Sequence, residues 1–489
     1  MKSKLEHDNQ ITKMSVTSNL FWRFAERFFA QMIAFIVSVI LARVLEPTAY
    51  GTVALIAVFT SILQVFVDSG LGNALIQKKD ADDLDFSTVF FTNITFCTLL
   101  FGLVFIVAPS IAKFYDDISL VPYIRVLGLT VLISGIKNVQ QAYVSRHLMF
   151  RKFFFSTLSG TVIAGIVGVV MAYNGFGVWA LITQQVVNLS VDTLVLWVTV
   201  KWRPKKTFSF QRLKGLFSYG WKLLVSALLD TGYTRLRQLI IGKVYSSEDL
   251  AFYDNGEKYP HLVITSVDVS IDSVLLPTLS RAQTDRDRVK SMTRRAIQIS
   301  TYIMAPLMMG LIFVAEPLTR ILLTEKWLPA VPFLRIFCVV YLFYPIHTAN
   351  LNAIKAMGRS DLFLKLEIIK KCIGLTAMLI TVGISVMAMA YSLLVTTFAN
   401  QVINNWPNRK LLNYGYFEQL KDILPNLFLA LFMGLCVYTI SFIGLNDLLT
   451  LIIQIIVGGI IYIGCSILFK LESYSYSIDI LKRYVKKVN

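Results

Sequence analysis

The sequence contains little charge for its length. Asp, Glu, Lys and Arg make up 16% of its 489 residues, against about 25% in typical soluble domains. Hydrophobic residues account for 55%, and the mean hydropathy is +0.63. These values exclude a soluble globular fold, and the 34 Phe and 21 Tyr exclude intrinsic disorder. The composition therefore predicts an all-α, polytopic membrane protein.

Cysteine is scarce as well. The five cysteines all lie in apolar stretches, and none forms a CxxC pair. This pattern argues against a disulfide framework and against a cysteine metal site. The sequence also lacks a GxxxxGK[ST] loop to hold ATP. We therefore expect no metal and no cofactor, and we expect energy coupling to come from ions, protons or product removal.

Apolar runs separated by charge, proline and glycine predict about fourteen transmembrane helices, because a helix needs about 20 mostly apolar residues to cross the hydrocarbon layer. The expected spans are residues 28–45, 50–76, 87–112, 119–143, 153–173, 178–200, 217–243, 259–280, 297–323, 330–354, 362–382, 384–405, 423–443 and 449–469. The opening residues are polar and lead into a long helix, so we expect no signal peptide.

Lys and Arg divide unequally between alternate loops. Most fall on one side, and those expected on the other side are Arg43, Lys113, Lys243, Lys258, Arg320 and Lys326. Cytoplasmic loops carry an excess of Lys and Arg, so both termini are predicted to be cytoplasmic. This topology accounts for most of the +17 net charge, and we expect no nucleic-acid partner.

The chain also contains an internal repeat. Val121 to Arg125 (VPYIR) open the fourth span, and Val331 to Arg335 (VPFLR) open the tenth. Each copy contains six spans, an even number, so both copies enter the membrane from the same side. We expect two parallel six-helix bundles plus two extra C-terminal helices. The predicted parts are an N-terminal lobe at residues 1–200, a cytoplasmic linker at 201–216, a C-terminal lobe at 217–408, and extra helices with a cytoplasmic tail at 409–489.

Cationic side chains inside the spans are candidates for substrate binding, because a charge at mid-bilayer costs about 2.5 to 3.5 kcal/mol on insertion scales. The candidates are Arg23, Arg27, Lys137, Arg235 and Arg237. For Arg23 and Arg27 the alternative is snorkelling to the interface. Lys137 lies deep within its span, where snorkelling is harder, so we favour a cavity role there.

Carboxylates inside the spans are candidates for ion coupling. They are Glu26, Asp68, Asp230, Asp268 and Asp272, and Asp192 is also embedded in apolar sequence. Burial raises a carboxylate pKa and can make the group a proton carrier, whereas a nearby Lys or Arg holds it ionised in a structural ion pair. The sequence leaves both interpretations open.

One short loop is acidic. It contains a DxD spacing of the kind that holds a metal-bound nucleotide sugar. Its carboxylates are Asp80, Asp82, Asp83 and Asp85, beside Lys78 and Lys79. We interpret this segment as a solvated loop flanking a helix, with a metal site as the alternative.

Several ordered strings resemble one protein family over roughly residues 15–410. They are LARVLEPTAYG (41–51), DSGLGNALIQKKD (68–80), NGFGVWALITQQ (174–185), LLPTLSR (275–281), AEPL (315–318), WLPAVPFLRI (327–336) and AMGRSDL (356–362). These strings resemble the bacterial polysaccharide flippases of the multidrug/oligosaccharidyl-lipid/polysaccharide (MATE-like) superfamily, in its colanic-acid-exporter-like branch. Relatives often carry an acidic residue where this chain has Arg237, so an inherited acidic role is in doubt at that position.

The resemblance implies an alternating-access carrier and not an enzyme. Such a carrier moves an undecaprenyl-diphosphate-linked oligosaccharide from the inner to the outer leaflet of the bacterial plasma membrane, for capsule, exopolysaccharide or O-antigen synthesis. We expect a monomer that contacts membrane lipid and acts beside the polysaccharide polymerase machinery. Two alternatives remain: a multidrug or lipid exporter of the same fold, and a membrane polymerase or ligase of lipid-linked sugars. The short outer loops leave little room for a catalytic platform.

Overall fold

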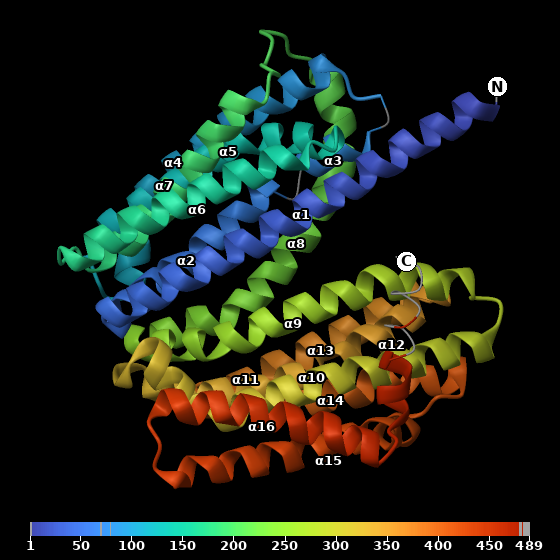
Figure 1. Ribbon diagram of the computed structural model, residues 1–489. Coiled ribbons are helices and arrows are strands. Elements are labelled where there is room, and N and C mark those ends of the chain that lie inside the picture. The colour runs from blue at the N-terminus through green and yellow to red at the C-terminus, as the bar shows by residue number, and fades with distance from the viewer. Residues whose placement is uncertain (1, 69–70, 79, 479–481, 483–489) are drawn as a thin grey trace. The chain divides into compact units, whose positions relative to one another are not determined.

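The computed structural model describes residues 2–68, 71–78, 80–478 and 482 (Figure 1). Side chains are described from residue 21 onward, apart from those of residues 219, 223, 266, 269, 270, 272 and 273. Within the described part the chain is helical and contains no strand, which confirms the predicted all-α class.

The helices follow one another with short connections. The first unit contains α1 (Lys2–Val44), α2 (Pro47–Asp68), α3 (Leu71–Gln77), α4 (Asp83–Phe114), α5 (Leu120–Arg146), α6 (Phe150–Tyr173), α7 (Val178–Thr199) and α8 (Phe210–Val244). The remainder consists of α9 (Ser247–Arg281), α10 (Arg286–Leu323), η1 (Glu325–Ala330), α11 (Val331–Leu342), α12 (Tyr344–Ala356), α13 (Ser360–Thr381), α14 (Val386–Leu412), α15 (Tyr416–Thr439), η2 (Ile440–Ile443) and α16 (Asp447–Leu468).

All fourteen predicted spans fall on helical segments. Among the described residues, 11 segments are long and apolar enough to cross a membrane. The predicted spans on α8, α9 and α13 are not among these 11, and each of these helices carries several charged residues. A multi-pass membrane protein is therefore confirmed, whereas the count of fourteen spans stays a prediction.

The chain divides into two compact units, residues 1–250 and 251–489. The first unit ends four residues into α9, so it contains α8, whereas the sequence places that helix in the second lobe. Within this unit, α8 packs on α2, α3 and α4. The lobe boundary at residues 201–216 is predicted from the internal repeat, whereas the units are defined by packing. The division into repeat lobes therefore stays a prediction.

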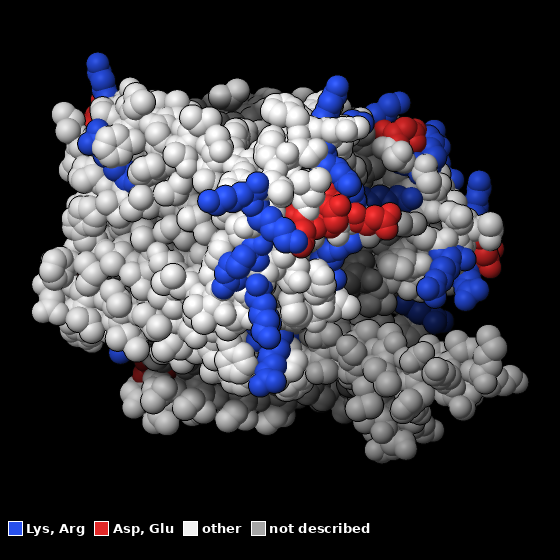
Figure 2. Space-filling view, turned by 90° about the horizontal axis from the view of Figure 1, so that it is seen from above, with Lys and Arg blue, Asp and Glu red and all other residues white. Residues whose placement is uncertain are grey.

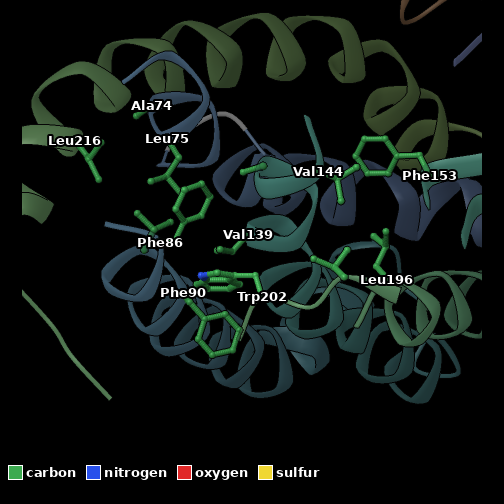
Figure 3. Close-up of a cluster of buried hydrophobic side chains, with 13 residues drawn as sticks. Ala74, Leu75, Phe86, Phe90, Val139, Val144, Phe153, Leu196, Trp202 and Leu216 are labelled. Atoms are coloured by element: carbon green, nitrogen blue, oxygen red, sulfur yellow. The ribbon is translucent and has the colours of Figure 1, made fainter. Parts of the chain in front are cut away.

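The core of the first unit is built around aromatic rings. Phe86 and Phe90 of α4 approach Trp202, with ring centroids 5.7 and 6.5 Å from the indole, and Val139 of α5 joins them (Figure 3). Tyr143 stacks on Trp202 at 5.9 Å. This cluster fixes the segment between α7 and α8 against α4 and α5.

The predicted tenth span is broken in the structure. The sequence predicts one helix over 330–354, but α11 ends at Leu342 and α12 begins at Tyr344. Pro345 explains the break, because it lacks a backbone N–H and its ring clashes with the carbonyl of Tyr341. The predicted second span includes α2, which ends at Asp68, and α3, which begins at Leu71; residues 69 and 70 lie outside the described residues.

Two arginines at equivalent positions of the repeat make matching contacts. The Arg125 Nε donates to the carbonyl of Phe105 on α4 at 3.4 Å. The Arg335 Nε donates to the carbonyl of Ile312 on α10 at 3.2 Å. In each case the arginine near the start of one helix binds the backbone of the preceding long helix. These matching contacts support the internal repeat.

Helix α10 is the centre of the second unit. It packs against α11, α12, α14, α15 and α16. Close approach between α9 and the start of α11 depends on Gly256, where an added Cβ would lie 2.6 Å from the Phe333 Cβ and 2.9 Å from the backbone nitrogen of Leu334. A larger residue at position 256 would force the two helices apart.

Candidate functional site

An ion pair lies in the helical interior of the first unit. The Nζ of Lys137 on α5 donates to the Oδ2 of Asp192 on α7. The Lys137 side chain is 12% exposed and that of Asp192 is 9% exposed, so water screens the pair weakly. Lys137, the predicted cavity cation, therefore has a carboxylate partner. That partner, Asp192, was not among the predicted site residues.

Asp68 belongs to the surroundings of this pair. Its side chain is exposed and accepts a hydrogen bond from the Gln64 Nε2 at 3.1 Å. Asp68 directly follows Val67, whose carbonyl accepts a hydrogen bond from Asn138, the neighbour of Lys137 in sequence. The structure therefore places this predicted ion-coupling carboxylate beside the segment that contains the predicted substrate cation.

Two asparagines extend this polar region. The Asn138 Nδ2, next to Lys137 in sequence, donates to the carbonyl of Val67 at 3.1 Å. The Asn93 Nδ2 donates to the Asn138 Oδ1 at 3.3 Å. Both side chains are buried, and they satisfy the backbone near the end of α2. Sequence reasoning missed these asparagines, although amides in apolar runs are a readable signal.

Arg23 and Arg27 lie about one helical turn apart on α1, but their surroundings differ. The Arg23 Nη1 donates to the Glu26 Oε2 at 2.6 Å, and its guanidinium lies over the rings of Phe150 and Phe153. The other Glu26 oxygen accepts from the Thr157 hydroxyl of α6 at 3.3 Å. Arg23 and Glu26 therefore join α1 to α6, whereas Arg27 is exposed.

The remaining predicted residues lie on α8 and α9. The Arg235 Nη1 donates to the Gln238 Oε1 at 2.8 Å, and Arg235 and Arg237 are both half-buried. Asp230 is exposed and Asp268 is half-buried. The side chain of Asp272, another predicted ion-coupling residue, lies outside the described residues.

The acidic loop flanks a helix as predicted, with Asp80, Asp82 and Asp83 exposed, but Asp85 is buried in a structural clamp. Asp85 is fully buried, and both of its carboxylate oxygens accept from the Lys78 Nζ at 2.6 Å. Asp83 pairs with Lys205 at 2.6 Å and accepts from the Trp202 indole at 3.2 Å. The clamp thus ties the segment before α8 to the start of α4.

Asp82 completes this arrangement as the N-cap of α4. The backbone N–H of Asp85 donates to the Asp82 Oδ1 at 3.0 Å, and the Asp82 N–H donates to the Asp85 Oδ2 at 3.2 Å. The hydrogen bond from Asp85 holds the pKa of Asp82 below its usual value. Arg212 also approaches Asp82, at 3.3 Å. Figure 2 shows Lys and Arg side chains around a small acidic group on the face that it views.

These contacts leave the DxD segment unsuited to a metal. Its carboxylates bind Lys, Arg and backbone N–H groups of the same unit. Within the part of the chain that the structure describes, no group of three or more His, Cys, Asp or Glu side chains is arranged to hold a metal ion. The geometry therefore favours the helix-flanking interpretation, with one correction: Asp85 is buried and not solvated.

Removing the buried carboxylate of Asp85 is expected to destabilise the first unit. Asp85→Ala should lower the free energy of unfolding by about 3 kcal/mol, because Lys78 and the Asp82 N–H would lose their shared acceptor. Thermal or denaturant unfolding of the purified protein measures this change. Asp80→Ala, at an exposed position in the same loop, should change stability by less than about 0.5 kcal/mol. Equal effects of the two substitutions would contradict the clamp.

The second unit contains a polar network that sequence reasoning missed. Arg294 of α10 binds Asp422 of α15 through two hydrogen bonds, of 2.9 Å from Nε and 2.7 Å from Nη2. The Tyr414 hydroxyl donates to the same carboxylate at 2.7 Å. The Asn426 Nδ2 donates to the carbonyl of Gln298 at 3.2 Å. Helix α15, the first of the two extra C-terminal helices, is therefore joined to α10 by specific polar contacts and not by apolar packing alone.

An apolar groove of about 560 Å³ lies between α9 and α10, within the second unit. Arg295 is the one charged residue among the described lining residues, and its guanidinium lies over the ring of Tyr476 at 5.1 Å. The lining residues are Val267, Ile271, Val274, Leu275, Thr278, Met292, Arg295, Ala296, Ile299, Ser300 and Ile303. The groove can hold a hydrocarbon chain, with the guanidinium available to an anionic group.

Comparisons with known proteins agree on a family and a fold. A family model described as "Polysaccharide biosynthesis protein" matches residues 40–332. Teichuronic acid biosynthesis protein TuaB of Bacillus subtilis (strain 168) is 23% identical over 385 residues, with 78% of this chain and 80% of that protein covered. Lipopolysaccharide biosynthesis protein WzxC of Escherichia coli (strain K12) is 22% identical over 387 residues, with 79% and 77% covered.

Among solved structures, the lipid II flippase MurJ in an inward closed conformation matches with a TM-score of 0.73. The match covers 92% of this chain and 99% of that chain at 16% sequence identity. At this identity the likeness shows the fold. It confirms the predicted polytopic, all-α fold for a chain whose candidate site includes a largely buried lysine–aspartate pair.

Proposed function

Since this chain belongs to the polysaccharide biosynthesis protein family, we propose that it flips a lipid-linked oligosaccharide between the leaflets of a membrane. The substrate is an undecaprenyl-diphosphate-linked repeat unit for a surface polysaccharide. It moves from the inner to the outer leaflet of the bacterial plasma membrane by alternating access. The names of the relatives TuaB and WzxC, together with the MurJ-like fold, support this proposal.

The observation that carries the proposal is a cation kept within apolar helices. Lys137 is 12% exposed, on a helix that is long and apolar enough to span a membrane. A buried charge is costly and marks a substrate or ion pathway more often than a stabilising contact. A diphosphate is the part of this substrate that requires such a cation. Arg23, Arg27, Arg235 and Arg237 are further proposed contacts to the diphosphate or to acidic sugars.

The two ends of the substrate need different surroundings. The oligosaccharide cannot cross hydrocarbon unaided, since each hydroxyl stripped of water costs a few kcal/mol, about 4 to 8 in the least favourable solvent. The polyprenyl tail needs an apolar path. The groove between α9 and α10 supplies apolar lining of suitable volume, about 560 Å³, with Arg295 beside it. An apolar groove with a cation beside it supports a lipid-linked substrate over a free sugar.

The remaining parts of the proposal follow from this role. The protein acts as a carrier and not as an enzyme, as a monomer beside the polymerase machinery, with both termini in the cytoplasm. Glu26, Asp68, Asp230, Asp268 and Asp272 are proposed positions for ion coupling. A multidrug or lipid exporter of this fold would instead require one of these carboxylates for efflux and would leave the surface polysaccharide unchanged.

The leaflet in which substrate accumulates tests the proposal. In a strain that lacks this chain, we expect the undecaprenyl-diphosphate-linked oligosaccharide to accumulate on the inner leaflet and the surface polymer to be lost. Leaflet-specific labelling of the sugar in intact and permeabilised cells measures the distribution. Accumulation on the outer leaflet would instead indicate a polymerase or ligase. An unchanged polymer together with loss of drug efflux would indicate an exporter.

A further inference from the structure

The buried Lys137–Asp192 pair is incompletely satisfied. The Asp192 Oδ2 accepts from Lys137, but its Oδ1 is buried without a hydrogen-bond partner among the described residues. A carboxylate has about four acceptor sites, and an ammonium has three N–H donors. Each partner therefore retains unused hydrogen-bonding capacity inside the protein.

Such a pair contributes little to stability. Burying two charges is repaid only when the geometry is good and further hydrogen bonds satisfy the remaining lone pairs and protons. Those bonds are lacking at the Asp192 Oδ1 within the described structure. A well-packed apolar pair at the same two positions would be as stable or more stable. The ion pair therefore calls for an explanation other than stability.

The surrounding backbone fixes Asp192 more firmly than Lys137. At Gly160 of α6, an added Cβ would lie 2.8 Å from the Asn188 carbonyl oxygen and 3.2 Å from the Asp192 Cβ. This close approach of α6 and α7 leaves the short aspartate side chain little freedom. Lys137 has a long flexible stem, so the ammonium is the partner that moves.

Asp192 offsets the charge that Lys137 would otherwise offer to an anionic ligand. The two side chains form an ion pair, and as an ionised pair they carry no net charge. A diphosphate approaching Lys137 must then compete with Asp192 for the ammonium. Such competition weakens binding, and a carrier must release its substrate as well as capture it.

We propose that Asp192 is a positioning residue that competes with the substrate diphosphate for the Lys137 ammonium. In the empty carrier Asp192 holds Lys137 within the bundle. When substrate arrives, the ammonium turns from the carboxylate to the diphosphate oxygens, and it returns when substrate leaves. This inference rests on the proposed function, because it takes a diphosphate-linked lipid as the ligand.

Binding of undecaprenyl diphosphate to the full chain in lipid nanodiscs tests the inference. We expect Asp192→Asn to bind this probe about tenfold more tightly than the unmodified protein, which corresponds to about 1.4 kcal/mol. Lys137→Gln should bind it more weakly. In the double variant Lys137→Gln with Asp192→Asn, the gain should vanish, because the ammonium that Asp192 restrains is gone.

Three controls separate competition from other effects. Asp80→Asn removes a carboxylate from an exposed position of the same unit and should leave affinity unchanged. Asp192→Glu keeps the charge and should bind within about twofold of the unmodified protein. If Asp192→Asn folds poorly, Asp192→Ser removes the same charge with a smaller side chain and should show the same gain. A purely structural role for Asp192 predicts weaker binding in every neutral variant.

The inference is overturned by unchanged or weaker binding in a folded neutral variant, or by a gain that persists without Lys137. Absence of binding in both the unmodified protein and Asp192→Asn also overturns it. The proposed function is tested by a different experiment. It fails if the lipid-linked oligosaccharide has a normal leaflet distribution in the deletion strain. The two results are therefore distinguishable.

Discussion

Lys137→Gln is expected to reduce export of the surface polysaccharide by roughly 10- to 100-fold at equal protein level in the membrane. A hydrogen bond to a charged group contributes about 1.5 to 3 kcal/mol, which corresponds to that range of rates. Lys137 is the predicted substrate cation that the structure buries among helices of the first unit. Quantifying surface polymer in a deletion strain that expresses the variant measures the effect.

This prediction needs a control for folding, because Lys137→Gln leaves the buried Asp192 without its partner. Replacing both residues, Lys137→Met with Asp192→Leu, substitutes an apolar pair that should preserve or raise stability. The double variant should still fail to export polymer. Lys113→Gln, on the exposed end of α4, should export normally. Normal export by a stable double variant would show that the pair has only a structural role.

Asp422→Ala is expected to lower the free energy of unfolding of the second unit by about 3 kcal/mol or more. Asp422 is 6% exposed and receives two hydrogen bonds from Arg294 and one from Tyr414. Its removal leaves these donors without an acceptor where α10 contacts α15. Thermal unfolding, or the rate of proteolysis between α14 and α15, measures the loss.

The matched control is Glu472→Gln. Glu472 is 61% exposed and lies 3.8 Å from the same arginine. An exposed pair contributes about 0.2 to 1 kcal/mol, so this variant should behave almost as the unmodified protein does. If Asp422→Ala and Glu472→Gln were equally stable, the network would not hold α15 to α10.

The helical class was predictable because it depends on local pattern: long apolar runs specify helices in a membrane whatever their neighbours. The VPYIR and VPFLR strings predict the internal repeat, and Arg125 and Arg335 within them make corresponding backbone contacts. The division into two six-helix lobes stays a prediction. The break between α11 and α12 was harder to predict. Pro345 interrupts the tenth span, but a proline inside an apolar run does not always break a helix, as Pro109 within α4 shows.

Partners of the intramembrane charges could not be predicted from the sequence. Lys137 and Asp192 are 55 residues apart, and only the rotation and packing of α5 and α7 bring them together. Arg294 and Asp422 are 128 residues apart for the same reason. Asp85 was expected in water because its loop is acidic, yet Lys78 and the helix cap make its burial favourable. Sequence thus indicated which residues were unusual but not which charges neutralise one another.

Reconstitution into liposomes tests the central claim most directly. The purified chain is incorporated into vesicles with a fluorescent undecaprenyl-diphosphate-linked oligosaccharide in both leaflets, and the fraction accessible to an impermeant reagent is followed in time. The account predicts that the protein transfers the lipid from the protected leaflet, and that Lys137→Met with Asp192→Leu reconstitutes equally well without transfer. A protected fraction that stays constant with the unmodified protein, under inward and outward gradients of protons and sodium, would contradict it.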